Sequence, residues 1–197
     1  MKKLGFNIVM LGMIASGKDT QANILKNKYA LKLVETGVYS RKLLKEKSKN
    51  GDLARKTVGV GKPLPTLLLQ QFLKDEIKNK PKNKNLLFMG GRLKPEAQLI
   101  KKIMTASGEK LLVFYISLPD KEVYKRSLSR STGNMKEIYK VLDTHKLIAK
   151  RIKWHKDQVM KTVRYYDGLK LLRKINGAQP VPKVTKDILK AIESYIK

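Results

Sequence analysis

Short apolar runs rich in β-forming residues alternate along this chain with longer segments whose apolar positions recur at helical spacing. The first run, FNIVMLG, precedes a glycine-containing loop and then a segment with apolar residues at Ala22, Leu25 and Tyr29, the spacing of one helix face. We expect further strands at LKLVE, NLLFMGG, KLLVFYISL and GLKLLRKING, and further helices at SRKLLKEKSK, LPTLLLQQFLKDEIKNK, KPEAQLIKKIMTA, PDKEVYKRSLSRS, IYKVLDTHKLIAKRIKWHKDQVMK and PKVTKDILKAIESYI. This alternation predicts an α/β fold with a parallel five-stranded sheet that carries helices on both faces.

Two segments break the alternation. KNGDLARKTVGVGKPLP, residues 49–65, carries glycines and prolines, and STGNM, residues 131–135, is a glycine-containing loop between two basic helices. Both are candidates for mobile edges. Because 197 residues allow one substantial core, we expect a single domain with small insertions.

The charge balance adds an expectation about partners. Lysine and arginine number 44 against 16 acidic residues, a net charge of +28, which attracts phosphate-bearing molecules, including nonspecific contact with nucleic acid. The basic residues are spread along the chain, and 42% hydrophobic residues predict a packed core rather than a disordered basic tail. Only 8 of the 44 are arginines, whose rigid fork suits oxyanions; they are Arg41, Arg55, Arg92, Arg126, Arg130, Arg151, Arg164 and Arg173.

Cysteine usage and the N-terminal segment indicate the compartment. The sequence has no cysteine, which excludes disulfides and thiolate zinc sites and fits a reducing environment. The apolar start is far shorter than the roughly 18 residues of a membrane span and has no cleavage-like site after it. We therefore expect a soluble, cytoplasmic, monomeric protein that does not enter a membrane.

The stretch LGMIASGKDTQ carries the first candidate chemistry. Gly12, Gly17 and Lys18 fit the pattern G-x-x-x-x-G-K between a predicted strand and a predicted helix, where backbone N–H groups, the helix N-terminus and the lysine bind phosphates. The alternative is a tight turn with a solvent-exposed lysine. The phosphate interpretation predicts a P-loop NTPase-type fold and an ATP-binding loop that includes Gly12, Ala15, Ser16, Gly17, Lys18, Asp19 and Thr20.

The fuller form of this loop, G-x-x-x-S-G-K-x-T-Q, resembles that of adenylate kinases and related nucleoside monophosphate kinases, in which the threonine is displaced in the same way. Further motifs follow in the order of that family: ETGVYSR (residues 35–41), GKPLP (61–65), GGRLKPEA (90–97) and PDKEVYKRSLSR (119–130). The resemblance covers essentially the whole chain, and it implies a divergent member of the family with a short lid.

The resemblance also implies roles for individual residues. Thr36, Gly37 and Arg41 match acceptor-site positions, with the threonine near the base and the arginine at the phosphate. Arg92 falls on a phosphate-binding arginine, and Glu96 falls on the glutamine that reads the acceptor base. Five of the 8 arginines fall on family phosphate positions. The residues implied to act in catalysis are Lys18, Arg92, Arg126, Arg130 and Arg151, with Arg126 also at the ATP phosphates.

The implied reaction is reversible transfer of the ATP γ-phosphate to a nucleoside monophosphate, with AMP as the leading acceptor and Mg²⁺ as the cofactor of ATP. Such transfer requires two aligned polyanions, neutralised charge and exclusion of water. Residues 36–75 are expected to form the acceptor-binding insertion and residues 131–140 the lid, around a core of residues 1–35, 76–130 and 141–197. Lys140 stands where the family usually has a lid arginine. A lid that is short and free of cysteine excludes the zinc-bearing long-lid form.

Several carboxylates of the family pattern are missing. Val38, Thr66 and the neighbourhood of Met89 stand where the family has aspartates, the last of which helps to organise Mg²⁺. Asp19 stands where the family has glycine. A carboxylate beside phosphates is repulsive unless a cation lies between them, so Asp19, with Thr20, is a candidate for holding Mg²⁺ through its water ligands. The alternative is that Asp19 stabilises the start of the helix.

Glu96 is the other departure. Glutamine accepts from the N6 amino group of adenine and donates to N1, whereas an ionised glutamate only accepts and suits the N1–H and N2 donors of guanine. GMP or another nucleoside monophosphate is therefore an alternative acceptor, although Thr36 favours AMP. Gln98 is a poor substitute because it lies roughly 200° around the helix from Glu96. Glu96 as a solvated carboxylate in a first helical turn is the remaining interpretation.

The histidines and aromatic residues are expected to be structural. His145 and His155 have no partner at metal-ligand spacing, so we expect surface histidines. Trp154, Tyr165 and Tyr166 have rings that stack on bases, but packing between a helix and the core is the favoured interpretation. Two rival functions stay open: a catalytically degenerate nucleotide-binding relative, suggested by the missing carboxylates, and a basic nucleic-acid or ribosome-binding protein, suggested by the charge.

Overall fold

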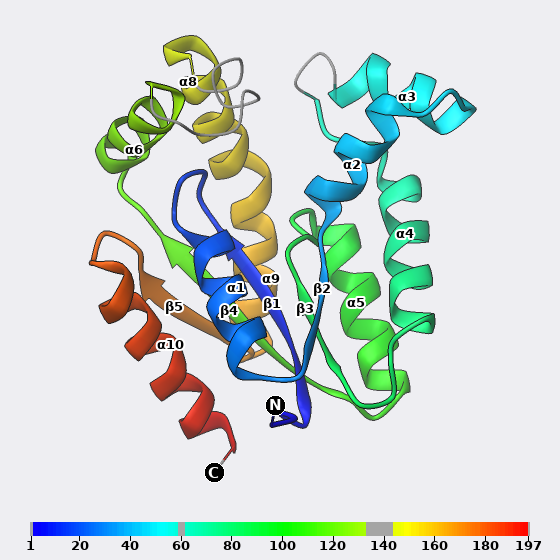
Figure 1. Cartoon of the computed structure of the whole chain (residues 1–197), viewed down its shortest axis with the longest axis vertical. Coiled ribbons are helices and arrows are strands. Elements are labelled where there is room, and N and C mark those ends of the chain that lie inside the picture. Colours follow the sequence, from blue (N-terminus) through cyan, green and yellow to red (C-terminus); the bar gives the residue numbers. More distant parts are fainter. Residues whose placement is uncertain (1, 59–61, 133–143, 197) are drawn as a thin grey trace.

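The structure is a computed structural model of the whole chain, and it describes residues 2–58, 62–132 and 144–196, with only the backbone of 131 and 132. Five strands form one sheet in which every pairing is parallel (Figure 1). They are β1 (Phe6–Gly12), β2 (Leu31–Val34), β3 (Asn85–Phe88), β4 (Lys110–Ser117) and β5 (Leu172–Asn176), in the order β2-β3-β1-β4-β5. The predicted P-loop-type parallel sheet is confirmed.

The helices of the described residues follow the strands in the expected alternation. They are α1 (Lys18–Lys28), α2 (Thr36–Lys45), α3 (Lys49–Thr57), α4 (Thr66–Lys78), α5 (Lys94–Ala106), α6 (Asp120–Thr132), α8 (His145–Trp154), the π-helical segment η2 (His155–Val159), α9 (Met160–Gly168) and α10 (Val181–Ile196). Alternate side chains of the strands point to opposite faces, so the sheet carries two hydrophobic layers.

Each face of the sheet is covered by its own set of helices (Figure 1). On one face, Ile8, Met10 and Phe114 of the central strands pack against α1 and α10. On the other face, Val9 and Val113 pack against α4, α5 and α9. Because both faces are buried, the central strands read as continuous apolar runs rather than as alternating patterns.

A smaller core lies outside the sheet, in the segment predicted to be the acceptor-binding insertion. Leu43, Ala54, Leu64 and Leu69 bury one another there, and the ring of Tyr39 stacks nearby on Phe72 with centroids 4.2 Å apart. Helices α2, α3 and α4 therefore have hydrophobic contacts of their own. The predicted domain boundaries themselves stay a prediction.

The structure differs from the sequence prediction in two helical regions. Residues 49–65 were expected to interrupt the pattern, but α3 forms within them, because the Ser48 hydroxyl accepts from the Gly51 N–H at 3.1 Å and caps the helix. The long basic helix was expected over residues 138–161. Its described part starts after Thr144, which caps α8, and continues through η2 and α9 to Gly168. Residues 138–143 and most of the predicted lid, including Lys140, lie outside the described residues.

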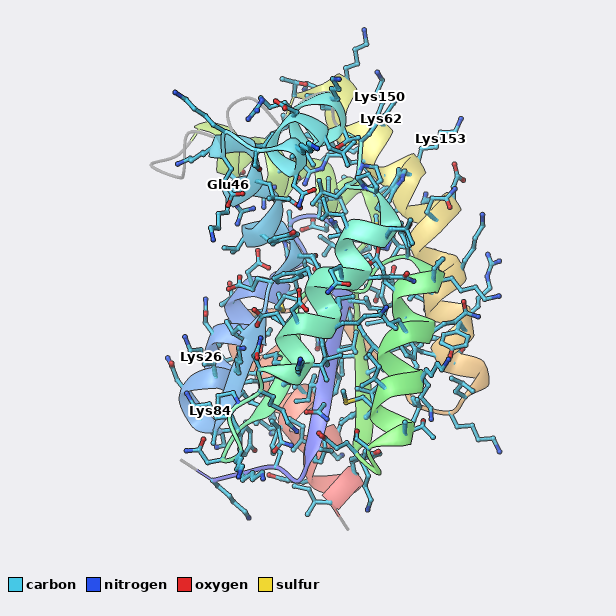
Figure 2. All side chains as sticks on the ribbon, turned by 90° about the vertical axis from the view of Figure 1, so that its right-hand side faces the viewer. Lys26, Glu46, Lys62, Lys84, Lys150 and Lys153 are labelled. Carbon is cyan, nitrogen blue, oxygen red and sulfur yellow. The ribbon has the colours of Figure 1, made fainter. Side chains whose placement is uncertain are left out.

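The surface carries many of the lysines that the composition contains. The lysines labelled in Figure 2 project outward from helix α1 (Lys26), from helix α8 (Lys150 and Lys153) and from two connecting segments (Lys62 and Lys84). Among the helices that the structure describes, none combines the length and apolar character that crossing a membrane requires.

Candidate active site

The site lies at the carboxyl edge of the sheet, where loops leave the parallel strands. The loop of residues 13–17 follows β1, Glu35 follows β2, and residues 89–93 follow β3. Because β3 lies between β1 and β2, these three connections meet at one edge, the usual location of ligand sites in open α/β sheets. The fold thus brings together motifs that are far apart in the sequence.

The loop after β1 has the backbone of an anion-binding turn. Ala15 and Gly17 both have positive φ angles, 56° and 82°, and Gly17 is the N-cap of α1, without a side-chain cap. Left-handed residues in such a turn direct successive N–H groups to one side, next to the positive end of the helix. A Cβ atom added to Gly12 would lie 2.7 Å from the Ser16 hydroxyl oxygen, so the loop packs tightly on β1. The predicted phosphate loop therefore has the local geometry that its motif requires.

Lys18 lies at the centre of a group of cations. Its side chain is 22% exposed, and burial lowers the pKa of Lys18, with further lowering by the positive charges of Arg92, Arg130 and Arg151 and a partial counter-effect from Asp19. The Lys18 ammonium lies 3.6 Å from an Asp19 carboxylate oxygen. The charges of three arginines act on Lys18, against one opposing carboxylate, so the surroundings of Lys18 carry excess positive charge that suits a polyanion.

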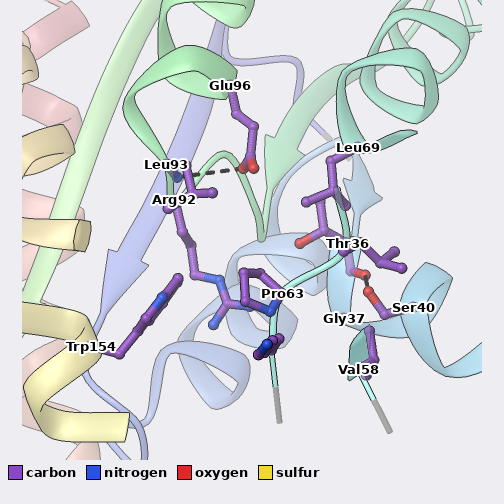
Figure 3. A pocket seen from close by; sticks show the side chains of 12 residues that line it. Thr36, Gly37, Ser40, Val58, Pro63, Leu69, Arg92, Leu93, Glu96 and Trp154 are labelled. Atoms are coloured by element: carbon purple, nitrogen blue, oxygen red, sulfur yellow. Dashed lines mark hydrogen bonds between the residues drawn. The ribbon is translucent and has the colours of Figure 1, made fainter. Parts of the chain in front are cut away.

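A cavity of about 150 Å³ opens between α2, α5 and α8 (Figure 3). Apolar side chains supply much of its wall, and Glu96, Arg92 and Lys62 are its charged members. The lining residues are Thr36, Gly37, Ser40, Val58, Lys62, Pro63, Leu64, Leu69, Arg92, Leu93, Glu96 and Trp154. A flat apolar ring with polar edges fits such a wall.

A second cavity of about 110 Å³ lies between the phosphate loop and α2. Its lining residues are Lys18, Asp19, Glu35, Thr36, Gly37, Val38, Arg41, Met89 and Arg92. Thr36, Gly37 and Arg92 line both cavities. The first cavity therefore continues toward Lys18, and Arg92 lies at the junction.

The comparison with protein families decides the assignment. The family model for adenylate kinase matches residues 10–170. The chain belongs to the adenylate kinase family. An adenylate kinase from Methanothrix thermoacetophila is 26% identical, and the match covers 96% of this chain and 99% of that relative. Relatives of the same name from Bacteroides fragilis, 27% identical over 95% of this chain and 98% of the relative, and Fusobacterium nucleatum, 24% identical over 96% and 99%, match equally fully. The family consists of ATP-dependent nucleoside monophosphate kinases, which confirms the enzyme class inferred from the motifs.

Not every arginine of the adenylate kinase pattern turns toward Lys18. Arg126 donates from a guanidinium nitrogen to the Gly177 carbonyl oxygen at 2.9 Å, and its Nε lies 3.5 Å from Glu122. These contacts direct Arg126 to the turn between β5 and α10. Its role at the ATP phosphates stays a prediction, as do the roles of Arg130 and Arg151, whose charges act on Lys18.

Sequence reasoning misplaced one residue of this chain and missed another. His155 was expected at the surface, but it is 5% exposed and its Nε2 lies 3.2 Å from the Tyr115 hydroxyl oxygen. Burial, with the charges of Arg92 and Lys18, lowers the pKa of His155 to about 4. Glu35 was not singled out, although it follows β2 directly and lines the second cavity. The rule that ligands bind at carboxyl ends of parallel strands would have identified it.

The aromatic residues divide between packing and the site. Tyr166 is fully buried and donates to the Ala97 carbonyl oxygen at 3.3 Å, and its ring lies beside that of Tyr165, as expected for core packing. Trp154 instead lines the first cavity, and the Arg92 guanidinium carbon lies 5.7 Å from its ring centroid. Trp154 is thus in a position to contact a ligand.

The second cavity offers a suitable but sparse environment for a metal. Among the described residues, no three His, Cys, Asp or Glu side chains gather into a metal cluster. Mg²⁺ bound with a nucleotide needs only one or two protein carboxylates, since phosphates and water supply its other ligands. Asp19 is 64% exposed, and the Glu35 side chain makes no capping hydrogen bond at the start of α2. Two carboxylates are therefore available beside Lys18, which fits the metal that accompanies ATP.

Proposed function

We propose that this protein transfers the γ-phosphoryl group of ATP reversibly to AMP, which yields two molecules of ADP. The observation that supports this most directly is Arg92, which lines both the cavity at Lys18 and the cavity with the apolar wall. A nucleoside monophosphate whose base occupies the first cavity would direct its phosphate past Arg92 toward the phosphate loop. Two phosphate subsites would then meet at one junction, as in-line transfer requires.

The residues divide into a donor side and an acceptor side. The backbone N–H groups of residues 12–17, together with Lys18, would hold the β- and γ-phosphates of ATP. Arg41 and Arg92 would hold the acceptor phosphate, while Thr36 and Glu96 contact its base. Arg126, Arg130 and Arg151 were implied to act at the phosphates by the resemblance, and the last two supply charge near Lys18. This arrangement stabilises negative charge that spreads in the transition state.

Mg²⁺ supplies neutralisation and alignment of the phosphate oxygens when it accompanies ATP. Asp19 and Thr20 would contact its water ligands from the first turn of α1, and Glu35 would face it from the end of β2. Asp19 also forms an ion pair with Lys18, so its removal affects two interactions. In Asp19→Gly, we expect ATP binding to need a higher Mg²⁺ concentration; an unchanged requirement would limit Asp19 to the ion pair and the helix start.

The reaction is tested by ADP formation from ATP, AMP and Mg²⁺. Lys18→Ala should lower the rate by about 10²–10³-fold, because one preorganised donor at the developing charge is lost. Lys26→Ala is the matched control, since Lys26 lies on the same helix but is exposed, and it should leave the rate unchanged. Equal rates in both variants, or ATP hydrolysis that does not depend on AMP, would overturn the proposal.

The same samples separate the two rival functions. A degenerate relative would bind ATP and AMP, detected by the fluorescence of the only tryptophan, Trp154, but would form no ADP. A dedicated nucleic-acid-binding protein would retain tight, sequence-selective RNA binding at physiological salt, whereas nonspecific attraction to a charge of +28 weakens steeply with salt. We expect the weak, salt-sensitive binding. We further propose that the protein acts in the cytoplasm, where ATP and AMP are present, and that it acts as a monomer.

A further inference from the structure

Glu96 is a buried carboxyl group with an unused oxygen. It is 2% exposed and lies in the first turn of α5, where its side chain points into the first cavity (Figure 3). One oxygen accepts from the Leu93 N–H at 3.5 Å, the long limit of a hydrogen bond. The other oxygen is buried, and among the residues that the structure describes it has no hydrogen-bond partner. A carboxyl group held in this way has its second oxygen available for a ligand in the cavity.

The surroundings of Glu96 contain few charges. The titratable groups that face it are Arg92 from the loop before α5, Lys62 from the segment before α4, and Tyr166 from α9. No ion pair joins Glu96 to a cation in the part of the chain that the structure describes. Arg92 directs its guanidinium over Trp154 instead. Burial therefore dominates and raises the pKa of Glu96, while the Leu93 hydrogen bond and the charge of Arg92 oppose the shift.

The two protonation states of this group present different hydrogen-bonding patterns. A protonated carboxyl group has one carbonyl acceptor and one O–H donor, the same pair as a glutamine amide. This pair matches the N6 donor and N1 acceptor of adenine. An ionised carboxylate has two acceptors, which match the N1–H and N2 donors of guanine. With the other base, each protonation state would leave a donor or acceptor unpaired, or would place two acceptors opposite each other.

We propose that Glu96 selects the acceptor base through its protonation state, so that the carboxylic acid binds the adenine of AMP and the carboxylate binds the guanine of GMP. The inference rests on the proposed function, because it takes the first cavity as the acceptor-base site. The wall around Glu96 suits either purine, since Val58, Leu64 and Leu69 present apolar surface to the ring. Selection between the bases then falls to the polar groups of the wall, which include Glu96 and Thr36.

The proposal predicts that the ratio of AMP to GMP affinity falls as the pH rises. Only the protonated fraction binds AMP, so its dissociation constant should rise about tenfold per pH unit above the pKa of Glu96. In Glu96→Gln the amide is fixed, so AMP binding should be favoured at every pH and the ratio should stay constant. The nucleotide phosphates titrate near a pKa of about 6, but they do so for both nucleotides and cancel in the ratio.

The experiment is an equilibrium titration of AMP and GMP between about pH 5.5 and pH 8.5, followed by Trp154 fluorescence. Calorimetry in two buffers of different ionisation enthalpy adds the number of protons taken up. Near neutral pH, AMP binding should take up more protons in the wild type than in Glu96→Gln, and GMP binding should show no such excess. Glu193→Gln, an exposed acid on α10, should behave as the wild type.

The outcomes separate this inference from the function on which it rests. Nucleotide binding with the same pH-independent ratio in the wild type and in Glu96→Gln would overturn the role of Glu96 and leave the kinase reaction intact. Absence of AMP and GMP binding in every variant, together with absence of ADP formation, would overturn both. Unfolding curves of each variant, measured on the same samples, confirm that the protein is folded when it is titrated.

Discussion

His155 links the interior of this protein to pH. It lies at the start of η2, fully packed, with its ring 5.9 Å from that of Tyr115 and its Nε2 within hydrogen-bond distance of the Tyr115 hydroxyl. Burial is the main cause that lowers the pKa of His155 from 6.5 to about 4, and the charges of Arg92 and Lys18 lower it further. The imidazole is therefore neutral in the folded protein at physiological pH.

The sign and size of the effect on stability follow from proton linkage. As pH falls below about 6.5, the unfolded chain takes up a proton at this histidine while the folded protein does not, until the pH approaches 4. The contribution of His155 is fully present above 6.5 and is lost progressively across this window. At about 1.4 kcal/mol per unit of pKa difference, the loss approaches about 3 kcal/mol. That is a large part of a typical unfolding free energy of about 5–15 kcal/mol.

Urea unfolding, followed by Trp154 fluorescence between about pH 7.5 and pH 4, measures this loss. Urea is uncharged and does not screen the electrostatics of a chain with a net charge of +28. His155→Gln keeps a hydrogen-bonding group near Tyr115 but cannot titrate, and the other ionisable groups are common to both proteins. The stability difference between wild type and variant should therefore shrink as the pH falls.

The matched control is His145→Gln, because His145 is exposed at the start of α8. Its curve should run parallel to that of the wild type at every pH. If the His155→Gln curve also ran parallel to the wild type between pH 6.5 and pH 4, His155 would titrate alike in the folded and unfolded states, and the burial argument would be wrong.

Three further changes test other parts of the structure. Ala15→Gly should stabilise the protein by about 0.5–1 kcal/mol in urea unfolding. Ala15 has a left-handed backbone, φ 56°, and relief of this strain, worth about 1–2 kcal/mol, exceeds the entropic cost of glycine. A loss of stability would show that the loop is unstrained. Gly90→Ala would place a Cβ atom into the Thr36 side chain, so AMP should bind at least about tenfold more weakly while ATP affinity is retained, and equal AMP affinity would contradict the close approach. Glu96→Gln should raise stability at neutral pH, because burial penalises the ionised carboxylate. The gain should grow as the pH rises above 4.5, the ordinary pKa of glutamate, and disappear below it. A gain that does not depend on pH would argue against a raised pKa of Glu96.

The sheet could be predicted from the sequence because its strands are buried on both faces. Runs such as LLVFYIS in β4 are continuously apolar, and the parallel pairing follows from the intervening helices. Helix α3 could not be predicted, because it contains a glycine and is followed by a segment of glycines and prolines, a composition typical of loops. Its stability comes from the Ser48 cap and from Ala54, which packs against the small core of the insertion. Such tertiary support is invisible to local periodicity.

The candidate site shows the same division. Gly12, Gly17 and Lys18 form a contiguous motif whose backbone geometry is local, so the phosphate loop was predictable. The orientations of His155 and Trp154 depend on the π-helical segment η2 between α8 and α9. In a π-helix each hydrogen bond spans five residues instead of four, which rotates the side chains that follow relative to those of a regular α-helix. A regular helix over 138–161, as predicted from the sequence, does not specify which of these neighbouring side chains faces the core and which faces the cavity.

The missing aspartates remove negative charge from the site. At Val38 and Met89 the second cavity is lined by apolar side chains where the family pattern has carboxylates, although Lys18, Arg41 and Arg92 still line it. Asp19 lines the same cavity from the first turn of α1, and Glu35 lines it from the end of β2. Carboxylates there repel bound phosphates unless a cation lies between them. Two carboxylates that line this cavity beside Lys18 and Arg92 are therefore what a requirement for Mg²⁺ beside the phosphates would explain.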